Sequence, residues 1–330
     1  MPELMLVVIV IIIALVFDFI NGFHDSANAI ATIVATNVLK PRNAVLLAAF
    51  WNFFGAFVFS VAVATTIGKG IISPDFVNIK VILAALIGAI LWNLITWYYG
   101  IPSSSSHALI GGLVGAGIIS AGIKSVIFSG LNKILLFIFI APLLGFIGAT
   151  IFTILMMWIF RNTSPGKIDG YFKKLQIVSS SFYSMGHGAN DAQKTMGIIA
   201  LLLFTSGFIS SFHVPAWVII ASYSAISLGT FFGGWRIVKT MGLKITKLKP
   251  FHGFAAETSG ALVLLVTSLF GIPVSTTHVI SGSIIGVGTV KRSSAVRWQI
   301  ARRIVLAWIL TIPATAAIAG LCYLAAGLFI

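Results

Sequence analysis

The sequence predicts an all-α polytopic membrane protein, and three observations support this fold class. The 330 residues are 58% hydrophobic and only 8% charged, with a mean hydropathy of +1.07, whereas about a quarter of the residues in soluble domains are charged. Many segments supply the ~20 mostly apolar residues that a membrane-spanning helix needs, and they lack the alternation of β-barrel strands. Finally, two motifs recur in the same order in each half of the chain.

The hydroxyl-rich motif shows the repeat most clearly. Residues 101–117 (IPSSSSHALIGGLVGAG) align without a gap on residues 272–288 (IPVSTTHVISGSIIGVG), and the serine pair 105–106 becomes the threonine pair 276–277. Ser103 aligns with a valine, so three of the four serines keep a hydroxyl counterpart. Internal repeats in a membrane protein are typical of transporters, which place their site at the interface between inverted repeats.

The acidic motif repeats upstream of each hydroxyl motif. Residues 22–28 (GFHDSAN) match residues 188–194 (GANDAQK), with Asp25 over Asp191. The order of the two motifs is the same in both halves, which makes coincidence a poor explanation.

The distribution of basic residues predicts that the two repeats are inverted. The second hydroxyl motif lies between two groups of five basic residues: Arg236, Lys239, Lys244, Lys247 and Lys249 before it, and Lys291, Arg292, Arg297, Arg302 and Arg303 after it. The first has only Lys69 and Lys80, offset by Asp75, before it and Lys124 and Lys133 after it. Because cytoplasmic loops are rich in Lys and Arg, we expect the second hairpin to enter from the cytoplasm and the first from outside.

The elements of each half follow from this orientation. We expect the first repeat, residues 1–160, to contain a broken crossing over 4–39, a crossing over 43–67, a re-entrant hairpin over 80–124 and a crossing over 131–160. A basic cytoplasmic linker, 161–175, leads to the second, inverted repeat, 176–330, with a broken segment to residue 213, a crossing to 236, a hairpin and a last crossing. Together these make about 12 membrane helical segments in one transport domain, with two opposed hairpins. Both termini are expected outside a plasma or inner cell membrane, since Glu3 is the only charged residue near the N-terminus.

Four of the seven acidic residues lie in or beside apolar segments: Asp18, Asp25, Asp191 and Glu257. A charge at the centre of a bilayer costs about 2.5–3.5 kcal/mol on insertion scales, so such residues usually pair, face a cavity or hold ions. Helical spacing places Asp18, Asn21, Asp25, Asn28 and Thr32 on one face. We expect a cation site formed by Asp25, Asn28, Asn190, Asp191 and Glu257, because carboxylate and amide oxygens suit hard cations.

Glycines beside the acids are expected to break the helices there. Gly22, Gly186 and Gly188 flank the acidic motifs, and the carbonyls of broken membrane helices can hold Na⁺. Alternatively, the polar residues of these segments only join helices through hydrogen bonds, as Ser, Thr and Asn often do in membranes.

The hydroxyl clusters are predicted to bind an oxyanion at two hairpin tips. Pro102 and Pro273 interrupt the chain, and the following Ser and Thr residues are preferred helix N-caps, whose backbone N–H groups bind anions, phosphate above all. The predicted phosphate ligands are Ser104, Ser105, Ser106, Ser275, Thr276, Thr277, Gln193 and Lys194. Supporting roles are expected for His24, His107, His187, His278 and Thr195. Capped hairpins without a ligand, histidines that only brace the tips, and Lys194 as a simple counter-ion remain open.

These four motifs, GFHDSANAIAT, HGANDAQK, IPSSSSHALIGG and IPVSTTHVISG, resemble those of the inorganic phosphate transporter (PiT) family over nearly the whole chain. The resemblance implies uptake of phosphate driven by a cation gradient, H⁺ in many bacterial members and Na⁺ in eukaryotic ones. It assigns the duplicated acidic signature to Asp25 with Asn28 and to Asn190 with Asp191. His24 departs from the family pattern, in which many members have Asn, and the large soluble loop of some members is missing.

The expected function is therefore import of inorganic phosphate by symport with Na⁺ through alternating access. Neutral oxygens beside each Asp favour Na⁺ over H⁺; an H⁺-coupled phosphate or metal-phosphate symporter is the alternative, and a sulfate or other oxyanion transporter or an anion channel is more remote. An enzyme is not expected, because the duplicated Ser and His clusters face opposite ways and no protease motif is present. No cofactor and no nucleic acid are expected, since the net charge of +14 follows the positive-inside pattern. The single Cys322 excludes an internal disulfide, and homo-oligomerisation is left open.

Overall fold

The computed structural model describes residues 2–327 and is helical throughout, with one isolated bridge between Ile72 and Val126 and no strand in that range. Its twelve α-helices are α1 (Pro2–Ala35), α2 (Pro41–Phe54), α3 (Ala62–Gly70), α4 (Ile79–Tyr99), α5 (Ser105–Ala121), α6 (Phe128–Ile159), α7 (Pro165–Thr205), α8 (Ala216–Phe232), α9 (Trp235–Lys239), α10 (Pro250–Leu269), α11 (Thr276–Lys291) and α12 (Trp298–Ala326). The predicted all-α class and the number of helical segments are confirmed.

Within residues 2–327, four helices are long and apolar enough to cross a membrane: α1, α4, α6 and α12. Two bent pairs raise this number to six if each is one span, namely α2 with α3, bent by 82°, and α8 with the segment 235–244, bent by 60°. Large apolar side chains such as Phe139, Leu143 and Leu310 are exposed, as expected of a surface that faces lipid.

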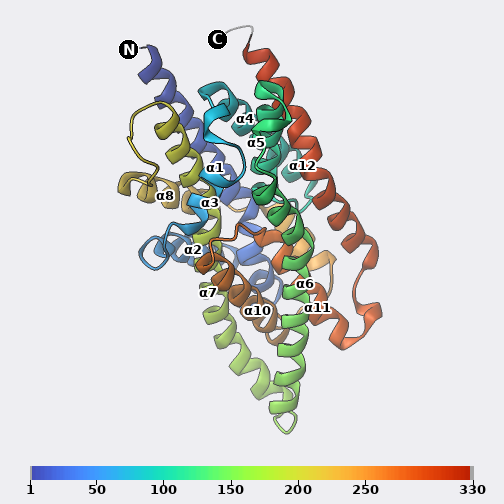
Figure 1. Cartoon of the computed structure of the whole chain (residues 1–330). Helices are drawn as coiled ribbons and strands as arrows, with labels where there is room; N and C mark the ends of the chain where they lie inside the picture. Colours follow the sequence, from blue (N-terminus) through green and yellow to red (C-terminus); the bar gives the residue numbers. More distant parts are fainter. Residues whose placement is uncertain (1, 328–330) are drawn as a thin grey trace.

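The two halves run in opposite directions. Figure 1 shows the N- and C-termini at one end of the molecule, with the turn between α6 and α7 at the other end. Helix α1 therefore runs away from the termini, and its counterpart α7 runs back towards them. The hairpin formed by α4 and α5 lies in the half of the molecule near the termini, and the hairpin formed by α10 and α11 lies in the other half.

Each half closes over the hairpin of the other half. Helix α5 packs along α12, and its counterpart α11 packs along α6. Thr66 in the first bent pair donates to the Gly271 carbonyl at the second hairpin tip (2.7 Å), and Thr240 in the second bent pair donates to the Gly100 carbonyl at the first tip (2.9 Å). The paired contacts show that the sequence repeat is a structural repeat.

The expectation that glycines break the helices beside the acids is wrong. Helices α1 and α7 run unbroken through Gly22, Gly186 and Gly188. Two of these glycines serve close packing instead, because a Cβ atom on Gly22 would lie 2.0 Å from the Ile226 carbonyl oxygen and one on Gly188 would lie 2.5 Å from that of Asn52. The chain breaks lie at the hairpin tips and within the two bent pairs.

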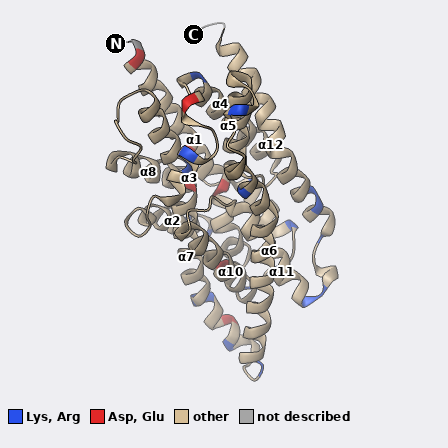
Figure 2. Ribbon diagram, viewed as in Figure 1, with Lys and Arg blue, Asp and Glu red and all other residues tan. Residues whose placement is uncertain are grey.

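The connection between the repeats is shorter than expected. Helix α7 begins at Pro165, so most of the predicted linker 161–175 belongs to its first turns. Pro at the first turn of a helix loses no hydrogen bond and has the required φ. Figure 2 shows Lys and Arg near this turn and along the connection between α11 and α12, away from the termini.

Candidate functional site

The two hairpin tips meet in the interior of the molecule. Ser104 is the N-cap of α5 and accepts from the His107 N–H (3.2 Å), and Ser275 is the N-cap of α11 and accepts from the His278 N–H (3.3 Å). The ring centroids of His107 and His278 are 4.7 Å apart. The predicted hydroxyl ligands, residues 104–106 and 275–277, are all at most 3% exposed, so the tips are closed off from solvent.

Lys194 on α7 connects both tips to an acidic residue. Its ammonium donates to the Ser106 hydroxyl of the first tip, to the Val274 carbonyl of the second tip (2.9 Å) and to the Asp191 carboxylate. These three bonds use all three N–H donors of a lysine. Lys194 is 1% exposed, and such complete pairing is what a buried charge requires.

Asp191 and Asn28 hold the second tip from α7 and α1. The Thr276 hydroxyl donates to Asp191 Oδ2 (2.9 Å). The Asn28 amide donates to the hydroxyls of Thr276 (3.0 Å) and Thr277 (2.9 Å). Residues from both acidic motifs thus contact the same hydroxyl cluster.

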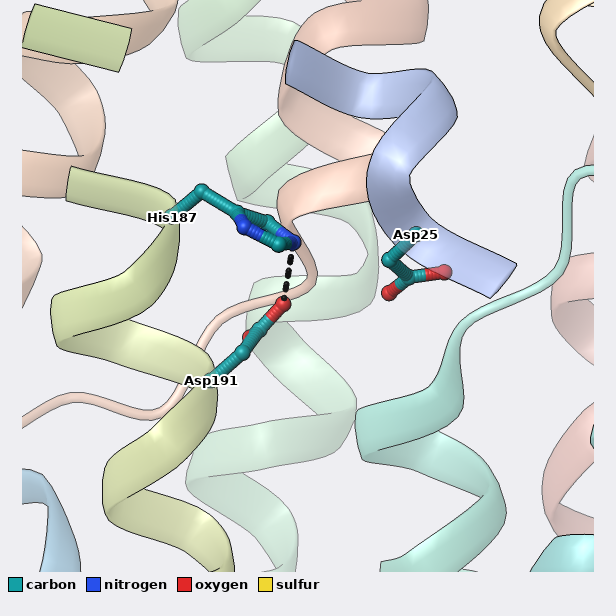
Figure 3. A group of neighbouring side chains, drawn as sticks. All are labelled: Asp25, His187 and Asp191. Carbon is teal, nitrogen blue, oxygen red and sulfur yellow. Dashed lines mark ion pairs between the residues drawn. The ribbon is translucent and has the colours of Figure 1, made fainter. Parts of the chain in front are cut away.

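Asp25 lies beside this group and pairs with His24. His24 Nδ1 is 2.6 Å from Asp25 Oδ1, and His24 Nε2 is 3.0 Å from the Thr96 hydroxyl. Asp25, His187 and Asp191 each place a possible ligand atom within 4.8 Å of the others, and His187 Nε2 lies 3.2 Å from Asp191 Oδ2. Figure 3 shows Asp25 from α1 and the two α7 residues directed towards a common space.

Several buried oxygen atoms near these residues accept no hydrogen bond from the part of the chain that the structure describes. They are both carboxylate oxygens of Asp18 and the amide oxygens of Asn21, Asn28 and Asn190. Leaving a buried acceptor unsatisfied costs roughly 1–3 kcal/mol. Oxygen atoms of this type are the ligands that hard cations prefer, so the donor set fits Na⁺.

Glu257 is separate from the Asp25 group. Its carboxylate accepts from Thr32 (2.5 Å), Gln176 (3.0 Å) and Ser179 (2.5 Å). The structure therefore divides the predicted cation ligands between two places. Thr32, at the end of the predicted polar face of α1, belongs to the Glu257 cluster.

Two other predicted ligands each use one of their two amide atoms in a contact with another element. The Gln193 side-chain oxygen accepts from the backbone N–H groups of Val63 (2.9 Å) and Ala64 (3.3 Å), at the start of α3. The free N–H groups of this helix N-terminus take its carbonyl oxygen, while its Nε2 has no partner within residues 2–327, so its role as a phosphate ligand stays a prediction. The Asn190 amide donates to Ser268 (3.3 Å) on α10.

Sequence reasoning missed three residues that complete these networks: Thr96, Gln176 and Ser179. Thr96 joins His24 to Ser103, since the Ser103 hydroxyl donates to it (2.9 Å). Gln176 and Ser179 lie next to the predicted basic linker. Polar residues are expected there, so the sequence did not mark these two as site residues. Their one sequence clue is the helical spacing with Tyr183 and His187 along one face of α7.

Comparisons with known proteins agree with this arrangement. The model of the phosphate transporter family matches the chain twice, over residues 21–168 and 161–319. A probable low-affinity inorganic phosphate transporter of Rhizobium meliloti is 56% identical, over 98% of this chain and 97% of the relative. A protein of the same description from Bacillus subtilis is 46% identical, over 97% of each chain.

A solved structure is also similar to this fold. It is described as the sodium-dependent phosphate transporter, and it matches with a TM-score of 0.88 and 27% identity over 99% of this chain and all of that one.

Proposed function

The chain belongs to the phosphate transporter family, and from this premise we propose that it imports inorganic phosphate by symport with Na⁺ through alternating access. Members of this family are multi-pass membrane transporters and not enzymes, and the chain is a phosphate transporter of this kind. The observation that carries the proposal is the meeting of two opposed hydroxyl-bearing tips beside two acids and a lysine.

Phosphate binds between the two tips in this proposal. Each tip presents the start of a helix, where N–H groups and the helix dipole favour an anion, and the hydroxyls of residues 104–106 and 275–277 supply further polar contacts. The Ser105 hydroxyl has no hydrogen-bond partner within residues 2–327, which leaves it free to donate to a ligand.

Na⁺ binds at Asp25 with the amide oxygen of Asn28. The carboxylate would repel phosphate unless a cation neutralised it, so each ligand favours the binding of the other, a reciprocal coupling free energy. The description of the similar solved structure as sodium-dependent supports Na⁺. The short contact between His24 Nδ1 and Asp25 Oδ1 supports the alternative, H⁺, because a proton can lie between these two atoms.

Purified protein in liposomes tests this function. We expect labelled phosphate to accumulate against its own gradient when Na⁺ is high outside, and to stop doing so when choline replaces Na⁺ at fixed pH. Accumulation that follows a pH gradient in choline would establish H⁺ coupling instead. Flux that only equilibrates phosphate would indicate an anion channel, and equal competition by sulfate would widen the substrate class. Asp25→Asn should abolish the cation dependence.

A further inference from the structure

The repeat makes Asn28 and Lys194 equivalent positions, yet they carry different groups. In the alignment of residues 22–28 with 188–194, Asp25 matches Asp191, and Asn28 matches Lys194. Both pairs are spaced three residues apart on one helix, so each amide or ammonium lies one turn from its acid.

The contacts confirm that the two positions are equivalent. Asn28 donates to Thr277 at the second hairpin tip, and Lys194 donates to Ser106, the residue that matches Thr277, at the first tip. Each repeat therefore sends this side chain across to the hairpin of the other repeat. The second half differs from the first in having a fixed positive charge at this point.

Asp25 and Asp191 therefore differ in the charged groups that pair with them. Asp191 is paired with the ammonium of Lys194, whereas the one ion-pair partner of Asp25 among the described residues is the imidazole of His24. The ammonium bridges Asp191, the first tip and the second tip. A bound cation at Asp191 would have to bridge these same groups.

We propose that the Lys194 ammonium is a tethered cation that takes the place of one transported cation at the second repeat. It neutralises Asp191 and holds the two tips together, so the chain binds one mobile cation fewer than a chain with Asn in both repeats. This inference rests on the proposed cation-coupled function and names the residue that sets how many cations accompany phosphate.

Two opposite substitutions test the inference. The readout is the Hill coefficient of the coupling cation for phosphate binding to purified protein, with the cation identified by the choline experiment. Lys194→Asn should raise the coefficient by about one, because it opens a second site of the Asp25 type, and Asn28→Lys should lower it by about one. The double variant N28K/K194N exchanges the two sites and should return to the wild-type coefficient. The control Lys133→Asn removes one exposed positive charge and should change nothing.

The outcomes separate this inference from the proposed function. An unchanged coefficient in both single variants overturns the inference and leaves the transport function standing. Loss of phosphate binding in folded K194N that no cation concentration restores also overturns it, because the ammonium would then be a phosphate ligand. If no cation affects phosphate binding by the wild type, cation coupling and the inference fall together. Melting temperatures check folding, and N28K and the double variant test the inference if K194N does not fold.

Discussion

Ser103 and Ser106 are three positions apart at the first hairpin tip, and their hydroxyls contact different parts of the molecule. The Ser103 hydroxyl donates to Thr96 on α4, and the Ser106 hydroxyl accepts from the buried ammonium of Lys194. The Ser103 hydroxyl contacts Thr96 within the hairpin and lies 3.4 Å from His24 Nε2 on α1, whereas the Ser106 hydroxyl joins the hairpin to the second repeat. At the residue scale, we therefore assign a structural role to Ser103 and a role in the binding site to Ser106.

Alanine substitutions should separate these two serines. Ser106→Ala removes a hydrogen bond to a charged group, worth roughly 1.5–3 kcal/mol, and should raise the phosphate concentration for half-maximal uptake by about tenfold or more. Ser103→Ala removes a neutral hydrogen bond of about 1 kcal/mol and should lower the melting temperature with little change in this concentration. Uptake measured in liposomes checks both, and equal changes in the two variants would contradict the assignment.

Glu257 is a buried acid that three donors hold in place. Thr32, Gln176 and Ser179 come from α1 and α7, so the carboxylate joins the α10 arm of the second hairpin to both long helices. Glu257→Gln keeps the shape but replaces one of the two accepting oxygens, Oε1 or Oε2, with an NH₂ group that cannot accept a hydrogen bond. We expect a loss of stability of about 1–3 kcal/mol for the unmet donor and a lower uptake rate. Thermal melting in detergent tests this, with Glu3→Gln as the control that should leave stability unchanged.

At the scale of elements, glycines on one face of α5 and of α11 allow these hairpin helices to pack closely against α12 and α6. A Cβ atom on Gly111 would lie 2.1 Å from the Thr315 hydroxyl oxygen, and one on Gly115 would lie 2.1 Å from the Ala316 carbonyl oxygen. The second repeat has the same arrangement, because Gly282 and Gly286 contact Pro142 and Phe146 on α6 in the same way. Small residues four apart allow membrane helices to approach closely.

A single added methyl group should therefore disrupt this packing. We expect Gly115→Ala to destabilise the fold by about 1–3 kcal/mol, the usual cost of overpacking, and to reduce the yield of folded protein. Gly166→Ala is the matched control, because no described residue places an atom within 4 Å of a Cβ atom there. Melting temperatures of the two variants that fall by the same amount would show that the close approach is unimportant.

The sequence alone predicted the hairpins well because their signals are local. Proline followed by hydroxyl residues specifies a break and an N-cap, and both Ser104 and Ser275 cap helices as expected. The role of Gly22 was mistaken because a glycine inside a helix can allow bending or close packing, and only the neighbouring Ile226 decides which. The contact of the Gln193 oxygen with the start of α3 could not be predicted for the same reason, since that partner is distant in sequence.

At the scale of the whole molecule, the two repeats enclose the site symmetrically. Thr66 and Thr240 fix opposite hairpin tips through matching contacts, and α5 and α11 pack on the last helix of the other repeat. A site enclosed by two such repeats can open to either side when one set of equivalent contacts breaks and the other holds. This is the geometry of alternating access. The six hydroxyl-bearing residues of the tips, 104–106 and 275–277, are at most 3% exposed in this structure.

The orientation of the molecule in the cell membrane is the last prediction. Position 75 lies in the connection between α3 and α4, which precedes the α4–α5 hairpin, and position 162 lies in the connection between α6 and α7. Figure 1 shows the α4–α5 hairpin in the half that carries the termini and the turn between α6 and α7 at the opposite end. Both residues are exposed. Because Lys and Arg gather in the loops of the second hairpin and near position 162, and basic loops stay in the cytoplasm, we expect position 75 outside and position 162 inside.

Cysteine labelling of intact cells checks this orientation. The Cys322→Ala background removes the only native thiol, and Asp75→Cys and Asn162→Cys are introduced into it one at a time. A membrane-impermeant maleimide should label Asp75→Cys on intact cells and Asn162→Cys only after permeabilisation, while phosphate uptake confirms that each variant folds. The opposite pattern would place the termini in the cytoplasm. It would also mean that the first hairpin, with Ser106 at its tip, enters from the cytoplasmic side.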